Sequence, residues 1–310
     1  MKIPLVSIII LEWNGKEFLE KCLHSIIKYT TYPNYELIVV DNRSNDGSVN
    51  FVEKNFPTIK LVKNNENLGF SKGNNIGVSN SVGEYILILN NDTEIFDKGW
   101  LHKAVEIFES DKKIGVVGCK LIWPDGKFQC AGGHVNFLKY AIFEEILFEK
   151  DLNGCKYNTK QEVDYIAGAA IFIRGKVIKE VEGFDEIFSP CHYEDKDICI
   201  KVKRRGYKII YMPKIEIIHY GSVTTKQHFK SEYVNYLLTR NKLLFALLNT
   251  PLKYLPVRIA EEFLSFLVYG IKKHDKNYIR AVLWNIKNLN LIAKRRIERR
   301  QKLNALISLP

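Results

Sequence analysis

The sequence lacks several features by which large classes of protein are recognised. Only six of its 310 residues are cysteines, no two form a CxxC pair, and no set of histidines and cysteines has zinc-ligand spacing. No signal-peptide pattern opens the chain, and no apolar run approaches the roughly 18 residues that a membrane span needs. We therefore expect reduced thiols in a cytosolic protein.

Two phosphate-binding patterns are also missing. No GxGxxG follows the first apolar run, residues 6–11, and no GxxxxGK[ST] occurs in the chain. A hydride-transferring Rossmann enzyme and a P-loop nucleotidase are therefore disfavoured. If a nucleotide diphosphate binds, a metal ion held by a carboxylate is the natural alternative, because Mg²⁺ and Mn²⁺ pair one or two carboxylates with substrate phosphates.

Positive charge is present, but it is concentrated at one end. The formal net charge is +11, and residues 231–310 hold 15 Lys and Arg against 5 Asp and Glu, a balance of +10. Aromatic residues such as Tyr269 and Trp284 lie among these basic ones. Such a region suits an anionic membrane surface, a dimer-forming or core-packing helical subdomain, or a plain solvent-facing surface, and the sequence leaves all three open. No nucleic-acid partner is expected.

The first half of the chain alternates β-branched apolar runs with helical spacing. This alternation is typical of βαβ units and predicts an α/β fold with a mostly parallel sheet flanked by helices. Strands are predicted at 6–11, 36–40, 59–62, 85–89, 114–118, 208–212 and 216–219. Helices are predicted at 15–28, 46–54, 71–79, 98–109, 195–205, 233–248, 256–271 and 276–300. Residues 124–161 are expected to form loops, and the domains are 1–228 (catalytic) and 229–310 (a helical appendage).

Polar side chains follow three of the predicted strands. Glu12 follows the first, Asp41 and Asn42 the second, and Asn91 and Asp92 the strand at 85–89. Ligands of open parallel sheets bind at the carboxyl ends of strands, so these residues together predict an active-site rim. A single aspartate there would more simply be a turn or helix-cap residue, which is our interpretation of Asp46.

Six motifs in order give the chain a family resemblance over roughly residues 4 to 225. They are VSIII with WNG (6–15), ELIVVDN (36–42), NLGFSKGNNIG (67–77), LILNNDT (87–93), GFDE with YEDKDIC (183–199), and RGYKI with HYGS (205–222). The sequence resembles glycosyltransferase family 2, which has the GT-A nucleotide-diphospho-sugar transferase fold, and within it the rhamnosyltransferase-like branch. The segment LILNNDT resembles the family's metal-binding motif. It departs from that of many relatives, because Asn90 and Asn91 leave Asp92 as its only carboxylate.

The resemblance implies an enzyme that moves a single sugar, with inversion, from a UDP-, dTDP- or GDP-sugar to an acceptor hydroxyl. The acceptor would be a glycan or a lipid-linked glycan of the cell envelope, at the cytoplasmic face of the membrane. Asp195 would be the catalytic base with Glu194 beside it, and Asp92 and His219 would bind Mg²⁺ or Mn²⁺. The donor-binding residues implied are Asp41, Asn42, Asn67, Gly69, Lys72, Asn75 and Asn91.

Other interpretations stay open at this point. The acidic stretch from Glu194 to Asp197 also suits a helix N-terminus stabilised by the helix dipole. Asp92 also suits a turn, and His219 a partly buried strand position. For the whole chain, the alternatives are a sugar-nucleotide-binding relative without transferase activity and a sugar nucleotidyltransferase. The latter normally opens with a Gly-rich loop carrying a basic residue, which does not follow residues 6–11.

Overall fold

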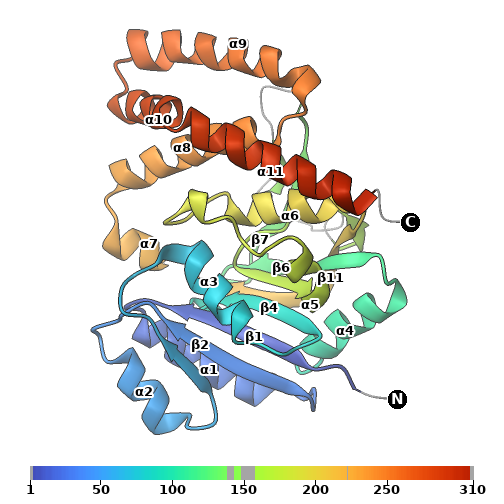
Figure 1. The fold of residues 1–310 in the computed structure, drawn as a ribbon. Coiled ribbons are helices and arrows are strands. Elements are labelled where there is room, and N and C mark those ends of the chain that lie inside the picture. The colour runs from blue at the N-terminus through green and yellow to red at the C-terminus, as the bar shows by residue number, and fades with distance from the viewer. Residues whose placement is uncertain (1–2, 138–142, 148–157, 222, 308–310) are drawn as a thin grey trace. The chain divides into compact units, whose positions relative to one another are not determined.

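The predicted alternation of strands and helices is confirmed in a computed structural model, which describes residues 3–137, 143–147, 158–221 and 223–307 (Figure 1). The chain forms two compact units. The larger comprises Met1–His134, Glu145–Pro190 and Glu194–Thr224, and the smaller comprises Val135–Glu144, Cys191–Tyr193 and Thr225–Pro310.

The larger unit is built on a mixed sheet whose strands run mostly in one direction. Four neighbouring strands are parallel, in the order β3 (Lys60–Lys63), β2 (Tyr35–Asp41), β1 (Val6–Glu12) and β4 (Tyr85–Asn90). The sheet then continues through β10 (Ala170–Arg174), β6 (Ile114–Ile122), β11 (Lys208–His219) and β5 (Thr93–Glu94). Because β10 is antiparallel to both β4 and β6, the strands β4 and β6 point the same way. β1, β2 and β4 are parallel to one another, so their carboxyl ends lie along one edge of the sheet.

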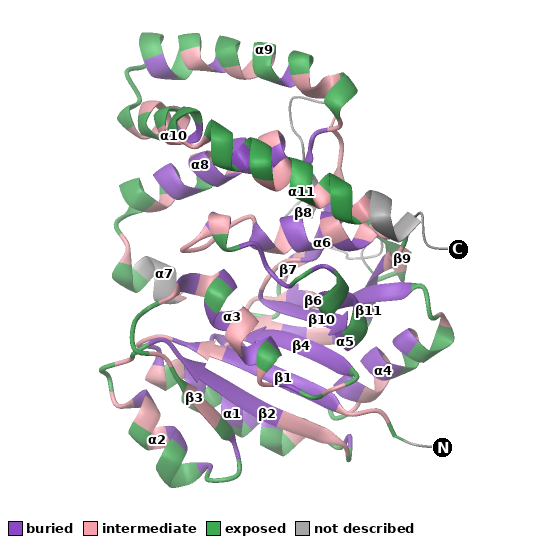
Figure 2. Ribbon diagram, viewed as in Figure 1, coloured by how far each residue is buried: buried purple, intermediate pink, exposed green. Residues whose placement is uncertain are grey.

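Helices of the same unit cover the sheet. They are α1 (Lys16–Tyr29), α2 (Ser48–Asn55), α3 (Gly69–Ser79), α4 (Trp100–Ser110), α5 (Gly175–Glu180) and α6 (Glu194–Arg204). The central strands are buried along most of their length (Figure 2). Helix α3 approaches β1 closely, because a Cβ on Gly77 would lie 2.3 Å from Cγ2 of Ile9. This glycine therefore allows α3 to pack directly on the sheet.

Two predictions about the middle of the chain are wrong. Residues 124–161 were expected to form loops, but they contain β7 (Phe128–Val135) and β8 (Phe143–Leu147), while residues 148–157 lie outside the described ranges. β7 pairs with β6, the strand directly before it, and with β8, the strand directly after it, so pairing with its neighbours outweighs the weak local signal of its glycine pair. β11 is one strand instead of two, with an irregular register between Met212 and Glu216 around Pro213.

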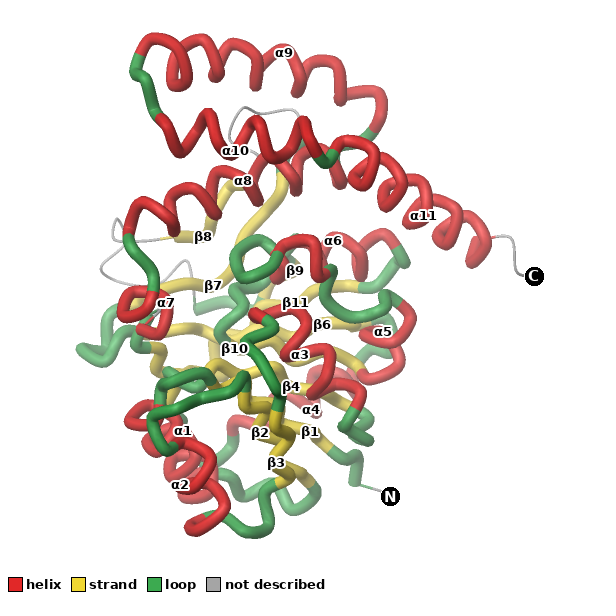
Figure 3. The backbone as a smooth tube through the Cα atoms, turned by 60° about the vertical axis from the view of Figure 1, so that its left-hand side comes forward, coloured by secondary structure: helices red, strands yellow, loops and turns green. Residues whose placement is uncertain are grey.

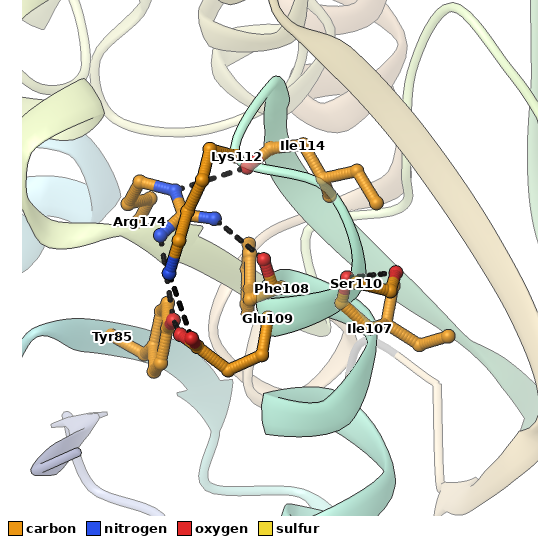
Figure 4. A network of polar contacts seen from close by, with 8 residues as sticks. All are labelled: Tyr85, Ile107, Phe108, Glu109, Ser110, Lys112, Ile114 and Arg174. Atoms are coloured by element: carbon orange, nitrogen blue, oxygen red, sulfur yellow. Dashed lines mark hydrogen bonds and ion pairs between the residues drawn. The ribbon is translucent and has the colours of Figure 1, made fainter. Parts of the chain in front are cut away.

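A buried arginine stabilises the start of β4, which is the end opposite its carboxyl terminus (Figure 4). The guanidinium of Arg174 lies 5.3 Å from the ring centres of both Tyr85 and Phe108. Its Nη2 donates to the carbonyl oxygen of Phe108 at 2.8 Å, and its Nε donates to that of Ile114 at 3.2 Å. Arg174 pairs with Tyr85 across the strands, so this network joins the start of β4, the end of β10 and the end of α4.

The smaller unit is mainly helical, as predicted. Its described helices include α8 (Ser231–Asn249), α9 (Leu255–Ser265), the π-helix η4 (Phe266–Lys272), α10 (Lys276–Lys287) and α11 (Leu289–Ile307). The predicted helix at 276–300 is two helices that meet at Asn288. Arg296 of α11 donates to the carbonyl oxygen of Leu247 at 2.5 Å, which ties α11 to the end of α8. None of the described helices combines the length and the apolar character that crossing a bilayer requires.

Candidate active site

The two predicted metal ligands lie next to each other. Strand β11 pairs with β5 so that His219 is opposite Thr93, and the N–H of Tyr220 donates to the carbonyl oxygen of Asp92 at 2.9 Å. This pairing brings Nε2 of His219 to 3.4 Å from Oδ1 of Asp92. Both side chains are largely buried, Asp92 more than His219. The turn after β4 and the end of β11 thus form one small polar site.

Gln129 of β7 holds His219 at two points. Its Oε1 lies 2.6 Å from Nδ1 of His219, and its Nε2 donates to the backbone oxygen of His219 at 3.0 Å. An amide oxygen only accepts hydrogen bonds, so with this amide orientation Nδ1 carries a hydrogen. In neutral His219 the lone pair of Nε2 then faces the carboxylate of Asp92. Two acceptors that face each other repel, and a proton or a metal ion between them would remove this repulsion.

The electrostatics of Asp92 fit the same interpretation. Burial alone raises the pKa of Asp92, but the contact with His219 and the N–H of Val223, 3.2 Å from Oδ2, together lower it by more. The net pKa of Asp92 lies below its ordinary value, so the side chain is a carboxylate at neutral pH.

Asp92 and His219 suit the protein part of a Mg²⁺ or Mn²⁺ site. Across the described residues, no three His, Cys, Asp or Glu side chains gather closely enough to hold a metal unaided. Such ions usually take one or two protein ligands and complete their coordination with phosphate oxygens and water. The second histidine nitrogen is hydrogen-bonded to Gln129, as is common for metal-binding histidines. The residues present therefore fit a metal that binds together with a diphosphate.

A buried glutamate braces the turn that carries Asp92. Oε2 of Glu12 accepts from Nδ2 of Asn91 at 2.6 Å, while Oε1 accepts from the N–H of Gly15 at 2.6 Å and from Oγ of Ser48 at 3.0 Å. Burial raises the pKa of Glu12 to about 7, although these three donors oppose the shift. Asn91 thus directs its amide into the protein in this structure. Its predicted contact with a nucleotide-sugar donor stays a prediction.

A second polar cluster forms at the carboxyl end of β2. Both carboxylate oxygens of Asp41 accept from the N–H of Ser44, at 3.1 and 3.3 Å. Nδ2 of Asn42 donates to the backbone oxygen of Gly69 at 3.2 Å and to Oδ1 of Asn67 at 3.3 Å. Three of the predicted donor-binding residues, Asn42, Asn67 and Gly69, are therefore hydrogen-bonded to one another at this strand end, next to Asp41. These hydrogen bonds do not test whether the residues contact a nucleotide-sugar donor.

Gly69 occupies a position that only glycine accommodates. Its φ is +73°, and a Cβ there would lie 2.8 Å from both the carbonyl oxygen of Pro190 and Oγ of Ser189. The next residue, Phe70, donates its N–H to the same carbonyl oxygen at 2.7 Å. The start of α3 is thereby held against the segment that precedes α6.

The other two donor-binding candidates on α3 differ from each other. Lys72 is exposed to solvent. Asn75 uses both ends of its amide on the backbone of Phe184, donating to its oxygen and accepting from its N–H, each at 2.9 Å. This residue joins α3 to the GFDE segment, a packing role that motif reasoning did not anticipate.

The predicted base lies at the N-terminus of α6. Oδ2 of Asp195 accepts from the N–H of Gly168 at 3.0 Å, and the carbonyl oxygen of Ala169 accepts from the N–H of Asn90 at 2.9 Å. Two hydrogen bonds thus connect Asp195 to the last residue of β4, two positions before Asp92. A helix N-terminus favours negative charge at this point.

The three acids of this stretch differ in accessibility. Glu194 and Asp197 are buried, whereas Asp195 is partly exposed. Only Asp195 among them combines a fixed orientation with access from solvent. The helix-cap interpretation and the catalytic one are both compatible with this geometry.

Sequence reasoning missed Gln129 and Gly168. Gln129 lies in the segment that was expected to form loops, so no periodic pattern marked it. Gly168 matters through its backbone N–H and through lack of a side chain, because a Cβ there would lie 3.3 Å from Cβ of Asp195. Glu12 was noticed only as a polar residue after the first strand. Glu12 holds the turn through hydrogen bonds with Gly15, Ser48 and Asn91. Ser48 and Asn91 are distant in the sequence, and Gly15 takes part only through its backbone N–H, so no sequence pattern indicates these contacts.

Comparison with known proteins agrees with this architecture. The model of the family "Glycosyl transferase family 2" matches residues 7–179. The fold is the GT-A fold of nucleotide-diphospho-sugar transferases. The chain belongs to glycosyltransferase family 2.

Two relatives illustrate the range of sequence similarity. The chain is 27% identical over 230 residues to the O-antigen biosynthesis protein RfbC of Myxococcus xanthus, covering 72% of this chain and 18% of that protein. It is 20% identical over 260 residues to N-acetylglucosaminyl-diphospho-decaprenol L-rhamnosyltransferase of Mycobacterium tuberculosis, covering 75% and 83%. The chain spans a quarter or less of the length of some curated relatives.

Two solved structures share the fold. The mannosyltransferase PcManGT from Pyrobaculum calidifontis, in complex with GDP-Man and Mn²⁺, has a TM-score of 0.56 at 16% identity and covers 98% of this chain and 88% of its own. Residues 1–349 of S. aureus TarS, in complex with UDP-GlcNAc, have a TM-score of 0.57 at 19% identity, with 89% and 79% covered.

Proposed function

We propose that this chain is a metal-dependent glycosyltransferase that moves one sugar from a nucleotide-diphosphate donor to an acceptor hydroxyl. The observation that carries the proposal is the grouping at the carboxyl end of β4. Asp92 lies beside His219 there, and Asp195 is hydrogen-bonded through Gly168 and Ala169 to the same strand end. A cation site for the departing diphosphate and a base for the acceptor are the two groups that inverting transfer needs.

The donor would enter along the edge formed by β1, β2 and β4. Asp41, Asn42, Asn67 and Gly69, clustered after β2, would bind the nucleotide, which is a UDP, dTDP or GDP moiety. When bound, Mg²⁺ or Mn²⁺ would neutralise charge that develops on the diphosphate as the sugar–phosphate bond breaks. Asp92 and His219 would hold that ion, with Gln129 fixing the histidine ring.

Asp195 would act on the acceptor. Its carboxylate takes the proton of the acceptor hydroxyl while that oxygen attacks the anomeric carbon from the face opposite the diphosphate. The new glycosidic bond forms, the bond to the phosphate oxygen breaks, and its electron pair leaves with the nucleoside diphosphate. The configuration at the anomeric carbon is inverted. The N–H of Gly168 orients the base without protonating it.

We place the reaction in the synthesis of cell-envelope polysaccharide or lipid-linked glycan, at the cytoplasmic face of the membrane. The names of the relatives support this setting, since one concerns O-antigen biosynthesis and another a decaprenol-linked acceptor. The sequence contains no QxxRW, the signature of processive relatives, so we expect one sugar per encounter.

A thermal-shift and donor-hydrolysis screen tests the proposal. The full chain is mixed with UDP-, dTDP- and GDP-sugars, with and without Mn²⁺, beside Asp92→Asn and the control Glu53→Gln on the exposed face of α2. A specific donor should raise Tm by mass action, and only with metal. Asp92→Asn should abolish the shift and the hydrolysis, whereas Glu53→Gln should keep both.

Two outcomes would overturn the proposal. Absence of any nucleotide-sugar binding with every metal would indicate a relative without transferase activity. Release of pyrophosphate from a nucleoside triphosphate and a sugar phosphate would identify a nucleotidyltransferase instead.

A further inference from the structure

Helix α9 has the reverse of the usual polarity of a surface helix. Its buried residues are Arg258 and Ser265, whereas Phe263 and Leu264 are each 61% exposed. Figure 2 shows much of α9 in the green of exposed residues. Helices on protein surfaces ordinarily bury the apolar face and show the polar face to water. The burial of α9 therefore needs an explanation in terms of what its apolar face contacts.

The exposed residues form one continuous stripe. They recur at spacings of three and four, which places them on a single side of the helix and of the start of η4. All of them are exposed and none is charged: Pro256, Ile259, Ala260, Phe263, Leu264 and Leu267. Contiguous apolar surface of this kind marks an interaction site.

The opposite stripe explains why the helix keeps this orientation. Arg258 forms an ion pair with Glu261 on the same helix. Glu262 accepts a hydrogen bond at 3.1 Å from the hydroxyl of Tyr278 on α10. α9, η4 and α10 follow one another as a helical hairpin, with η4 packed on α10 (Figure 3). The polar groups of α9 are thus engaged within the helical unit, and its apolar stripe is left facing outward.

A lysine and a tyrosine flank the stripe at each end. Nζ of Lys253 lies 4.6 Å from the ring centre of Tyr254, just before α9, and Nζ of Lys273 lies 4.5 Å from that of Tyr269, at the end of η4. Both lysines are exposed. Lysine and tyrosine combine an apolar body with a polar tip, and they are favoured at the boundary between lipid tails and head groups.

We infer that α9 and η4 form a docking surface for an anionic lipid membrane, with the helix lying in the plane of the interface. α9 and η4 run on without a break, with 11 and 7 residues and a length of at most about 27 Å. Arg258, Glu261 and Glu262 interrupt the apolar character that a membrane span needs, so the helix lies on the membrane. Residues 231–310 carry a balance of +10, which attracts anionic head groups and opposes an identical copy of the same unit. The inference goes beyond sugar transfer and does not depend on it.

Vesicle co-sedimentation of the full chain tests this surface. Vesicles contain phosphatidylcholine alone or phosphatidylcholine with phosphatidylglycerol. The variant Phe263→Glu/Leu264→Glu places two charges in the stripe, and the control Val82→Glu/Ile27→Glu makes the same change at two exposed apolar positions of the larger unit. Circular dichroism and the melting temperature without ligand report whether each variant folds.

We expect the wild type and the control to bind anionic vesicles, and the stripe variant to bind at least tenfold more weakly while keeping its fold. Added salt should weaken the wild-type binding. Equal binding by the stripe variant would overturn the inference. So would a wild type that ignores vesicles but forms a dimer, by light scattering, that the stripe variant dissociates, because the occupant would then be a second copy. Neither vesicle result depends on a sugar donor, so loss of the proposed activity would leave this test intact.

Discussion

The side-chain amide of Gln129 spans the backbone and the ring of His219, with its oxygen 2.6 Å from Nδ1 and its nitrogen 3.0 Å from the histidine carbonyl oxygen. This two-point contact determines which ring nitrogen is left for Asp92. In metal sites, such outer partners fix the tautomer and orientation of the ligand.

Gln129→Ala should therefore weaken Mn²⁺ binding and transfer by about 10- to 100-fold. Gln129→Glu keeps an oxygen acceptor for Nδ1 and should recover a large part of both. The measurement is the Mn²⁺ concentration that half-saturates donor hydrolysis, with melting temperature as a check on folding. If the glutamate variant is as impaired as the alanine variant, the ring is not positioned by this contact.

Asp195→Asn should separate binding from chemistry. The amide cannot accept the acceptor proton, so turnover should fall by roughly 10²- to 10⁴-fold. The donor-dependent rise in Tm should remain, because the donor site proposed at β2 and β4 is untouched. A variant with near-normal kcat would assign Asp195 to capping α6 alone.

Glu12 should make stability depend on pH. Its pKa in the folded protein, about 7, is raised above the ordinary value of 4.5, so the folded state holds the proton more tightly. This contribution is complete below pH 4.5 and is lost as pH rises to about 7, amounting to at most about 3 kcal/mol. Glu12→Gln should flatten the change in the free energy of unfolding between pH 5 and 8. Denaturant titrations at several pH values measure it, and parallel curves for both proteins would refute the role of Glu12.

Gly15→Ala should disturb the turn that carries Asp92. A Cβ at Gly15 would lie 2.4 Å from Nδ2 of Asn91, which is itself bonded to Glu12. We expect destabilisation of about 1–3 kcal/mol and weaker metal-dependent donor binding. Gly99→Ala is the matched control, because it precedes a helix in the same way and its nearest contact would be an ordinary 3.5 Å. Equal effects of the two changes would argue against the Asn91 contact.

The sequence predicted the parallel strands of the sheet, and the polar residues that follow three of them, because both leave a local pattern. The roles of these polar residues stay predictions. Apolar runs marked β1, β2 and β4, and the residues after them, including Asp41 and Asp92, follow from where each run stops. Gln129 was missed because its role depends on a contact with His219, which is 90 positions away in the sequence. Asn75 matched a motif, yet its amide is directed at the backbone of Phe184, and no spacing in the sequence shows the direction of a side chain.

Arg174→Met should affect stability without affecting the site. It removes three hydrogen bonds, which leaves the buried oxygens of Phe108 and Ile114 without this donor. We expect a loss of roughly 2–4 kcal/mol in the free energy of unfolding. KM for the donor should be unchanged below the melting temperature. An altered KM would show that the two ends of β4 are coupled.

The two ends of β4 therefore have different roles, because Arg174 contacts only the start of the strand. Tyr85 begins β4 within the arginine network, and Asn90 ends it beside the groups proposed for catalysis. Substitutions at the first end can therefore change the free energy of unfolding while the groups proposed for catalysis at the second stay as they are. A chain that adapts to a warmer habitat would accordingly be expected to change around Tyr85 and Phe108 and to keep Asn90 and Asp92.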